Sequence, residues 1–319
     1  MATWNEKDIP DLRGKRVLVT GGASGIGFET ARALAQHGAE VLIADRNVAA
    51  GRAAVDRIKT LRKGAKVGFR ALDLSRLEAV RKFGAARVAE GKPLDVLINN
   101  AGINSIGERL TSPDGNELTF AIGHLGHFVL TGMLLPLLSR APDPRVVTVS
   151  SLVHGRGWFD WSDLQMEKRY DSQRAYNQTK LANLLFAREL QRRIERSGGR
   201  IKSMAVHPGV ARTAISASRR ELGRFSLGDY MVSAVTSVVM PFLGQAATAG
   251  ALPTMYAAVS PDVRGGGFYG PDGFGEMKGT PKAAVIKPAG RDMAAARRLW
   301  ERSERITGFR YSFPARDRQ

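Results

Sequence analysis

Tyr176 and Lys180 are four positions apart in the segment Ala-Tyr-Asn-Gln-Thr-Lys, a spacing that suits proton chemistry. Residues i and i+4 share one face of a helix, so the lysine ammonium can stand beside the phenol. A free phenol has a pKa of ~10, and bringing it near 7 needs roughly 4 kcal/mol of preferential phenolate stabilisation. A lysine charge ~4 Å away supplies about that much at an effective dielectric constant of ~20. Ser151, which follows an apolar segment, can then hydrogen-bond the substrate oxygen while Tyr176 transfers the proton.

A glycine-rich turn near the N-terminus strengthens this interpretation, because Tyr-x-x-x-Lys alone is usually only a solvated helix face. Residues 15–20 (Lys-Arg-Val-Leu-Val-Thr) predict a short buried strand. Gly-Gly-Ala-Ser-Gly-Ile-Gly follows at 21–27, and residues 28–37 have the apolar period of a helix. Strand, glycine turn and helix in this order are typical of a dinucleotide-binding unit.

Each glycine of the turn has a separate expected task. Gly21 makes the tight turn, Gly25 lets the backbone approach a pyrophosphate at the helix N-terminus, and Gly27 lets helix and strand pack closely. A second predicted strand, 40–44, ends at Asp45, where a carboxylate can bind the adenosine ribose. An ordinary glycine-rich loop would not need the acidic residue at that place.

The order of these motifs resembles the short-chain dehydrogenase/reductase (SDR) superfamily over nearly the whole chain. The motifs are Thr20-Gly-x-x-x-Gly-x-Gly27, Asp73, Asn99-Asn100-Ala101-Gly102, Ser151, Tyr176-x-x-x-Lys180 and His207-Pro208-Gly209. Four segments resemble the retinol-dehydrogenase-like branch, which includes bacterial NAD(P)-dependent oxidoreductases: 116–128, 150–154, 180–190 and 266–274.

The resemblance implies hydride transfer between a nicotinamide ring and a carbinol or carbonyl carbon. Tyr176 is then the general acid/base, and Lys180 lowers its pKa and holds the nicotinamide ribose. Ser151 orients the substrate oxygen, with Ser150 as the competing serine. The implied cofactor contacts, in chain order, are Gly21, Ser24, Gly25, Ile26, Gly27, Asp45, Arg46, Asp73, Leu74, Asn99, Ala101, Gly102, Tyr176, Lys180, Pro208, Gly209, Val210 and Thr213. The expected substrate pocket comprises Ile103, Val153, His154, Trp158 and Phe159.

One position departs from the family pattern. The family usually has an asparagine just before His-Leu-Gly-His, where it holds a water that relays protons to the lysine, and here that position is Gly123. A water, His124 or the backbone takes over the relay, or the protein is slow or inactive. The last option keeps open a second class of function, a catalytically weak cofactor-binding sensor or scaffold.

Apolar segments alternate with helical patterns along the chain. The expected strands fall near 15–20, 40–45, 66–72, 94–98, 144–150, 201–206 and 267–269. This alternation predicts an α/β fold, a single-domain Rossmann fold with a doubly wound parallel seven-stranded sheet and helices on both faces. We expect one domain over 1–319, with 12–200 mainly the cofactor-binding half and catalytic helix, 207–275 the substrate-side lid and last strand, and 276–319 a C-terminal extension.

Two long excursions, 155–175 and 212–244, interrupt the alternation at the edge where ligands bind. Their apolar residues either line a substrate pocket or only cover the sheet edge: Trp158, Phe159, Trp161, Met231, Val232 and Val235. The segment 231–243 is shorter than the ~20 residues needed to span a bilayer. Peripheral contact of this segment with a membrane surface is a further alternative.

Composition narrows the remaining classes. The chain has no cysteine, and its five scattered histidines form no His-Glu-x-x-His pattern, so we expect neither thiolate chemistry nor a metal. The net charge of +18 comes from dispersed basic residues without a nucleic-acid-binding motif, so we expect a solvated surface and no specific nucleic-acid partner. The polar N-terminus lacks the apolar core of a secretory signal, which favours a cytoplasmic location. The sequence is compatible with either a homodimer or a homotetramer.

The leading hypothesis is an NAD(P)-dependent alcohol dehydrogenase or ketone/aldehyde reductase that acts on a small hydrophobic substrate. A protochlorophyllide-reductase-like enzyme is disfavoured because the cysteines expected in its site are missing. Epimerases and dehydratases of the extended branch have Gly-x-x-Gly-x-x-Gly, which this chain lacks.

The cofactor preference depends on two neighbouring residues. Asp45 accepts hydrogen bonds from both ribose hydroxyls and repels a 2′-phosphate, which favours NAD(H). Arg46 can pair with that phosphate and favours NADP(H). Because 21–27 contains no lysine or arginine, we expect NAD(H), with NADP(H) as the alternative.

Overall fold

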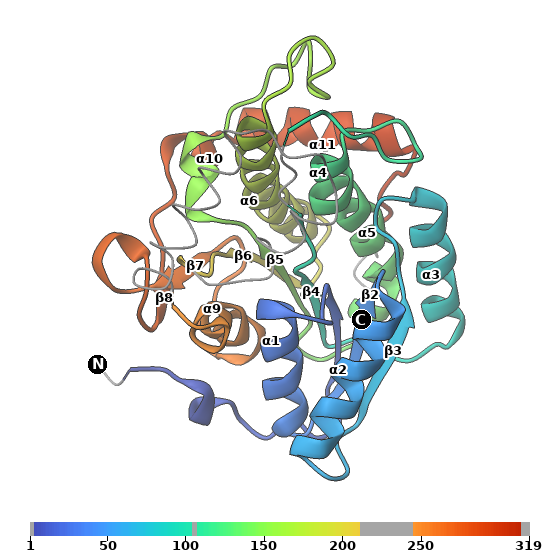
Figure 1. The fold of residues 1–319 in the computed structure, drawn as a ribbon, viewed down its shortest axis with the longest axis vertical. Helices are drawn as coiled ribbons and strands as arrows, with labels where there is room; N and C mark the ends of the chain where they lie inside the picture. Colours follow the sequence, from blue (N-terminus) through green and yellow to red (C-terminus); the bar gives the residue numbers. More distant parts are fainter. Residues whose placement is uncertain (1–2, 104–106, 211–244, 314–319) are drawn as a thin grey trace.

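The computed structural model describes residues 3–103, 107–210 and 245–313, which share one mostly parallel sheet in the order β3-β2-β1-β4-β5-β6-β7-β8 (Figure 1). The strands are β1 Arg16–Thr20, β2 Glu40–Asp45, β3 Val67–Ala71, β4 Val96–Asn99, β5 Arg145–Val149, β6 Lys202–Val206, β7 Phe268–Pro271 and β8 Pro281–Ala283. The helices are α1 Gly25–Gln36, α2 Val48–Leu61, α3 Leu77–Ala89, α4 Leu118–Phe120, α5 Gly126–Leu138, α6 Ser172–Arg196, α9 Ala247–Val259, α10 Pro288–Arg291 and α11 Met293–Thr307. The predicted doubly wound α/β fold is confirmed.

Helices cover both faces of the sheet because side chains alternate along each strand. Along β1, Val17 and Val19 point to the face covered by α1, α2 and α9. Leu18 points to the opposite face, which α3, α5 and α6 cover. Strands buried on both faces are apolar at nearly every position, which is why they were recognisable as continuous runs.

The strand order reverses at β1. This strand lies between β2 and β4, with Val17 opposite Val41 on one side and Val96 on the other. The connections from β1 and β4 therefore leave in opposite directions, and a crevice opens at the carboxyl ends of the two strands.

The sheet has eight strands where seven were expected. The seven expected strands are parallel, and β8 pairs with β7 in the antiparallel sense, with Tyr269 opposite Ala283. The added strand was missed because Pro281–Ala283 contains a proline and an exposed lysine and is too short for an apolar pattern. Part of the expected C-terminal extension therefore belongs to the sheet.

A π-helical turn, Ala121–Leu125, lies between α4 and α5, and Ile122 of this turn lines the crevice. The continuous stretch Leu118–Leu138 is long and apolar enough to cross a membrane, with a mean hydropathy of 1.6, but 83% of its most apolar window is buried inside the fold. Such burial is what the core helix of a globular domain shows.

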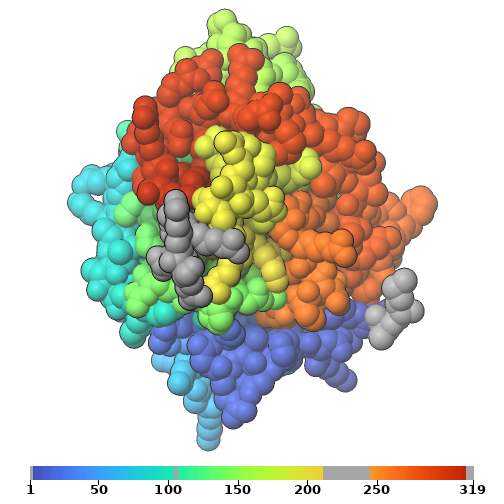
Figure 2. All heavy atoms as spheres, turned by 180° about the vertical axis from the view of Figure 1, so that it is seen from behind, coloured from blue at the N-terminus to red at the C-terminus, as the bar shows by residue number. Residues whose placement is uncertain are grey.

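The C-terminal residues complete the core on this side. Trp300 of α11 is 2% exposed and packs edge-on against Phe128 of α5, with ring centroids 5.0 Å apart. Tyr311 follows α11 and donates its hydroxyl to the Phe128 carbonyl oxygen at 2.6 Å. Figure 2 views the molecule from behind relative to Figure 1, and this C-terminal part, in red, covers part of the surface there.

Candidate active site

A groove with a volume of about 340 Å³ lies at the carboxyl ends of the parallel strands. It contains most of the residues expected to contact a cofactor: Gly21, Ser24, Gly25, Ile26, Gly27, Asp45, Arg46, Asp73, Leu74, Ala101, Gly102, Tyr176, Lys180 and Pro208. Residues far apart in the sequence, from Gly21 to Pro208, therefore meet in one groove, as ligand binding at a topological switch point requires.

The glycine turn forms one end of the groove. Gly21 has a φ of +64°, and a Cβ there would lie 2.8 Å from the Ala101 Cα, so only glycine fits. A Cβ on Gly27 would collide with the Gly21 carbonyl oxygen. The first turn of α1 starts at Gly25, and its cap residue Ser24 makes no side-chain hydrogen bond to the helix. The backbone N–H groups at this helix end can therefore serve an anion.

A buried hydrogen-bond chain fixes the neighbouring loop. Thr20 Oγ1 accepts the backbone N–H groups of Asn100 at 2.9 Å and Ala101 at 3.1 Å. His127 Nδ1 lies 3.1 Å from the Gly123 carbonyl oxygen and must donate to it, which leaves Nε2 to accept from Thr20 Oγ1 at 2.8 Å. Burial lowers the pKa of His127 to about 4, which agrees with this neutral form.

The asparagine that lines the groove is Asn100 and not the expected Asn99. Asn99 is 1% exposed and donates its Nδ2 to Thr131 Oγ1 at 2.9 Å inside the core. Adjacent residues at the end of β4 point to opposite sides, so the motif alone did not show which of the two faces the groove.

Tyr176 and Lys180 both line the groove from the first half of α6, which begins at the cap residue Asp171. Lys180 Nζ is 5.5 Å from the centre of the Tyr176 ring and donates to the Val149 carbonyl oxygen at 3.2 Å. Lys180 is 5% exposed, and burial lowers its pKa to about 8. The Lys180 amine is therefore mostly protonated, and positively charged, at pH 7.

The two serines after β5 differ in what their hydroxyls do. Ser150 lines the groove and is 1% exposed, but its Oγ donates to the Lys180 carbonyl oxygen at 2.6 Å. Ser151 is less buried, and its Oγ accepts the Val153 N–H at a long 3.4 Å. Ser150 is thus engaged in fixing α6, whereas the Ser151 hydroxyl is less constrained, although Ser151 is not among the residues that line the groove.

The far end of the groove is the segment after β6. Pro208 lines the groove, whereas Gly209 and Val210 lie behind it against the β7–β8 hairpin. Val210 donates its N–H to the Met277 carbonyl oxygen at 2.7 Å. Thr213, also expected at this end, falls outside the described residues.

His207, which precedes Pro208, has no exposed surface. Its Nδ1 accepts the Gly209 N–H at 3.2 Å, so the proton is on Nε2. Burial lowers the pKa of His207 to about 3, so its ring is neutral at physiological pH.

Of the residues expected in the substrate pocket, Ile103 lines the groove and Val153 follows the serine pair. His154 is held by two hydrogen bonds: Nδ1 donates to the Ser151 carbonyl oxygen at 2.8 Å, and Nε2 accepts the Lys287 N–H at 3.2 Å. Its ring therefore helps to fix the Ser151 segment.

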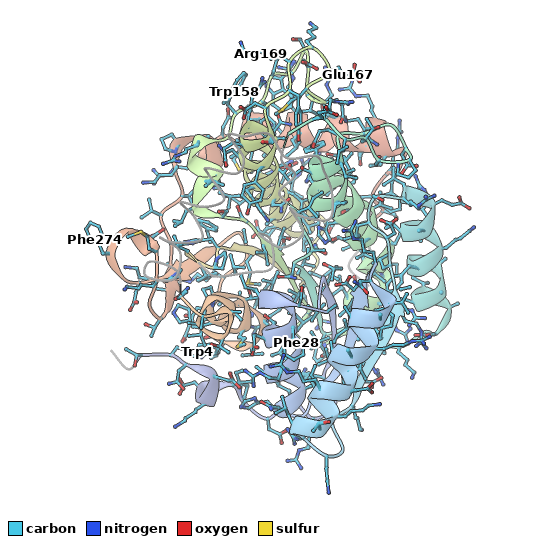
Figure 3. The ribbon with its side chains drawn as sticks, viewed as in Figure 1. Trp4, Phe28, Trp158, Glu167, Arg169 and Phe274 are labelled. Atoms are coloured by element: carbon cyan, nitrogen blue, oxygen red, sulfur yellow. The ribbon has the colours of Figure 1, made fainter. Side chains whose placement is uncertain are left out.

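Trp158 and Phe159 are not brought to the groove. Trp158 is 53% exposed at the edge of the molecule, where the Arg174 guanidinium stacks 3.9 Å from its ring centre (Figure 3). Phe159 packs with Trp161, at 4.8 Å between ring centres, on the apolar cluster that joins α6 and α11. In this excursion the apolar residues cover helices, and the expected lid residues Met231, Val232 and Val235 fall outside the described residues.

Gly123 lies in the π-helical turn, directly against α6. A Cβ at this position would stand 2.6 Å from Thr179 Cγ2, so the absent side chain permits a close helix contact. His124 faces away from the groove and pairs with Ser303 of α11 at 2.8 Å. His124 therefore does not replace the missing asparagine. Over the described ranges there is also no group of three acidic or histidine side chains that could hold a metal.

The fold and the groove together define a dinucleotide-binding α/β protein with a buried lysine beside a tyrosine. The sequence profile described as short chain dehydrogenase matches residues 15–222. The chain is 38% identical to human retinol dehydrogenase 13 over 303 residues, which covers 93% of this chain and 86% of that protein. It is 39% identical to human retinol dehydrogenase 12, over 94% of this chain and 88% of the relative. This chain therefore belongs to the short-chain dehydrogenase/reductase family of oxidoreductases and to its retinol-dehydrogenase-like part.

Solved structures agree with this assignment. An uncharacterised protein from Mycobacterium paratuberculosis has a TM-score of 0.77 and 35% identity, with coverage of 98% of this chain and 100% of that chain. A short-chain dehydrogenase/reductase from Burkholderia phymatum in complex with NAD has a TM-score of 0.61 at 20% identity, over 77% of this chain and 86% of that one. A Shigella flexneri family member complexed with NADP has a TM-score of 0.61 at 23% identity, over 81% and 97%. The last two support the fold alone.

Proposed function

We propose that this protein is an NAD(P)-dependent oxidoreductase that interconverts a hydrophobic alcohol and its aldehyde or ketone. The observation that carries the proposal is Lys180, a lysine buried on the groove wall beside Tyr176. A buried cation is costly, and such groups cluster at functional sites. The sequence similarity to retinol dehydrogenases supports an extended, apolar alcohol as the substrate class.

The groove fits a dinucleotide at its glycine turn. Gly21 and Gly27 let this turn pack closely against Ala101 and against itself, and α1 begins there with Ser24 making no side-chain hydrogen bond to the first N–H groups of the helix. Asp45, whose carboxylate accepts the Ala23 N–H of the glycine turn, and Asp73 line the part of the groove where the adenosine would lie. When bound, the nicotinamide cofactor supplies or accepts the hydride.

The side chains of this protein donate and accept the proton of the reaction. In the reductive direction the Tyr176 hydroxyl donates a proton to the substrate oxygen as the carbonyl carbon is reduced. The Lys180 ammonium stabilises the tyrosinate that remains, and the Ser151 hydroxyl donates a hydrogen bond to the same substrate oxygen. In the oxidative direction the same groups act in reverse, with tyrosinate as the base.

Turnover separates this proposal from the alternative of a cofactor-binding sensor or scaffold. The protein is mixed with NADH or NADPH and aldehydes and ketones of graded size, retinal included, and single-turnover oxidation of the cofactor is followed by absorbance. We expect oxidation with the longer apolar carbonyls and little with short ones. Tight cofactor binding with no hydride transfer to any of them would contradict the oxidoreductase and support the sensor.

For the cofactor itself we propose NAD(H). The Asp45 carboxylate lines the groove and accepts the N–H groups of Ala23 at 3.3 Å and Asn47 at 3.0 Å, so it is fixed where ribose hydroxyls or a 2′-phosphate would arrive. Arg46 lines the same corner and is the feature that favours NADP(H). A ligand stabilises a protein by RT ln(1 + [L]/Kd), so melting temperatures at equal NADH and NADPH concentrations compare the two affinities. We expect the larger shift with NADH; a larger shift with NADPH would reverse the choice.

A further inference from the structure

Glu276 has a backbone conformation that a glutamate rarely adopts. It ends the short turn Phe274–Glu276 between β7 and β8, and its φ is +57°. Glycine takes this left-handed conformation without strain, whereas a side chain makes it unfavourable. A strained backbone conformation persists where the surrounding contacts stabilise it, so the contacts of the Glu276 carboxylate are of interest.

The two carboxylate oxygens of Glu276 face two different partners. Oε1 accepts the backbone N–H of Val285 at 2.8 Å, just after β8. Oε2 lies 3.3 Å from His207 Nε2, which carries the ring proton because Nδ1 is occupied by the Gly209 N–H. His207 Nε2 is buried and makes no hydrogen bond to the described residues, and this carboxylate oxygen is the ion-pair contact recorded for it. The Val285 N–H and the His207 Nε2–H are both donors, and each faces one of the two acceptor oxygens of the carboxylate.

The hairpin around Glu276 also supports the backbone of the segment after His207. Met277 accepts the Val210 N–H at 2.7 Å, and a Cβ on Gly209 would collide with the same carbonyl group. A Cβ on Gly270 of β7 would collide with the His207 imidazole. The ring thus fills a closely fitting space between the β7–β8 hairpin and the segment that ends at the groove.

We propose that Glu276 is a positioning residue for the cofactor: through His207 it fixes the segment 207–210 and so holds Pro208 at the nicotinamide end of the groove. This inference rests on the proposed function, because it assigns a nicotinamide to that end. Glu276 itself does not line the groove and touches no reacting atom.

Two variants separate the carboxylate from the turn. Glu276→Gly removes the carboxylate and suits the left-handed φ, so the hairpin keeps its shape. Glu276→Gln keeps the size of the side chain but has one acceptor and one donor for two facing donors, so one contact is lost. Phe274→Ala is the control on the same hairpin, because Phe274 is 90% exposed and projects away from the molecule (Figure 3).

The readout compares two ligands of the intact protein by calorimetry. NADH carries the nicotinamide, and ADP-ribose lacks it but reports on the adenosine and pyrophosphate end. For both Glu276 variants we expect the Kd of NADH to rise roughly tenfold, because the buried Nε2–H of His207 is left without the carboxylate that it faces, while the Kd of ADP-ribose stays unchanged. Phe274→Ala should bind both like the parent protein.

An unchanged NADH affinity in Glu276→Gly would overturn the inference, and so would an equal loss for NADH and ADP-ribose, which indicates general damage to the fold. Failure of the proposed function looks different. In that case the unsubstituted protein transfers no hydride to any of the carbonyl compounds, whether it binds NADH or NADPH or neither.

Discussion

At the residue scale, the spacing of Tyr176 and Lys180 was enough to predict that the two side chains share a groove. Helical periodicity fixes which residues share a face, so this part of the site followed from the sequence alone. The choice between Asn99 and Asn100 did not, because it depends on which side of β4 the groove lies. The roles of Ser150 and Lys180 also needed the structure, since burial and a hydrogen bond decide them.

The burial of Lys180 should make the stability of the protein depend on pH. Its pKa is lowered from 10.5 to about 8, which corresponds to a penalty on the order of 3 kcal/mol for holding the charge in the native state. Below pH 8 both native and unfolded chains are protonated and the penalty is complete. Between pH 8 and 10.5 the native state loses its proton first, so the penalty shrinks as the pH rises.

Lys180→Met should therefore raise the free energy of unfolding by about 1–3 kcal/mol at pH 7, because it removes the charge and keeps the length of the side chain. The advantage over the parent protein should decline towards pH 10. Urea unfolding of the two proteins without cofactor at pH 7 and pH 10 checks both points. A variant that is less stable than the parent at pH 7 would show that the buried charge of Lys180 does not destabilise the native state.

At the element scale, seven strand positions were predictable because strands covered on both faces are apolar at most positions. The short β8 lacks that pattern and forms because the hairpin returns the chain alongside β7. The π-helical turn at Ala121–Leu125 left no periodic signal. Gly123 marked the place as unusual, but its reason, contact with Thr179 of α6, was visible only in the structure.

That contact decides what an asparagine at position 123 would do. We expect Gly123→Asn to lower the free energy of unfolding by ~1–3 kcal/mol through overpacking, because its Cβ would stand 2.6 Å from Thr179 Cγ2. Thr179→Ser removes that methyl group and keeps the hydroxyl that donates to the Ala175 carbonyl oxygen at 2.8 Å. The double variant should therefore recover much of the loss.

Chemical denaturation of both single variants and the double variant gives the coupling energy between the two positions. Thr179→Ser alone serves as the control and should cost about 1 kcal/mol for the lost methyl group. Strictly additive losses would mean that the two positions do not press on each other. A stable Gly123→Asn protein without turnover would count against a water relay in the space left by the glycine.

At the scale of the whole molecule, the topology gives the separate motifs a common place. The strand order reverses between β2-β1 and β4, and side chains from 21–27, 100–103 and 176–180 meet at the carboxyl edge of that point. Order along the chain predicted this meeting. It did not predict that the 155–175 excursion covers helices, because apolar side chains suit a pocket wall and a helix cover equally well. The C-terminal residues are also part of the core, with Trp300 packed between α5 and α6.

In the proposed reaction Tyr176 transfers the proton while a nicotinamide cofactor transfers the hydride. The most direct test is Tyr176→Phe, measured for NADH affinity and for kcat with the best carbonyl substrate of the parent protein. We expect NADH to bind about as tightly as before, because the ring and Lys180 remain, and kcat to fall at least a hundredfold, as for loss of a general acid. Turnover within about a factor of ten of the parent, equivalent to only ~1.4 kcal/mol of barrier, would show that another group donates the proton.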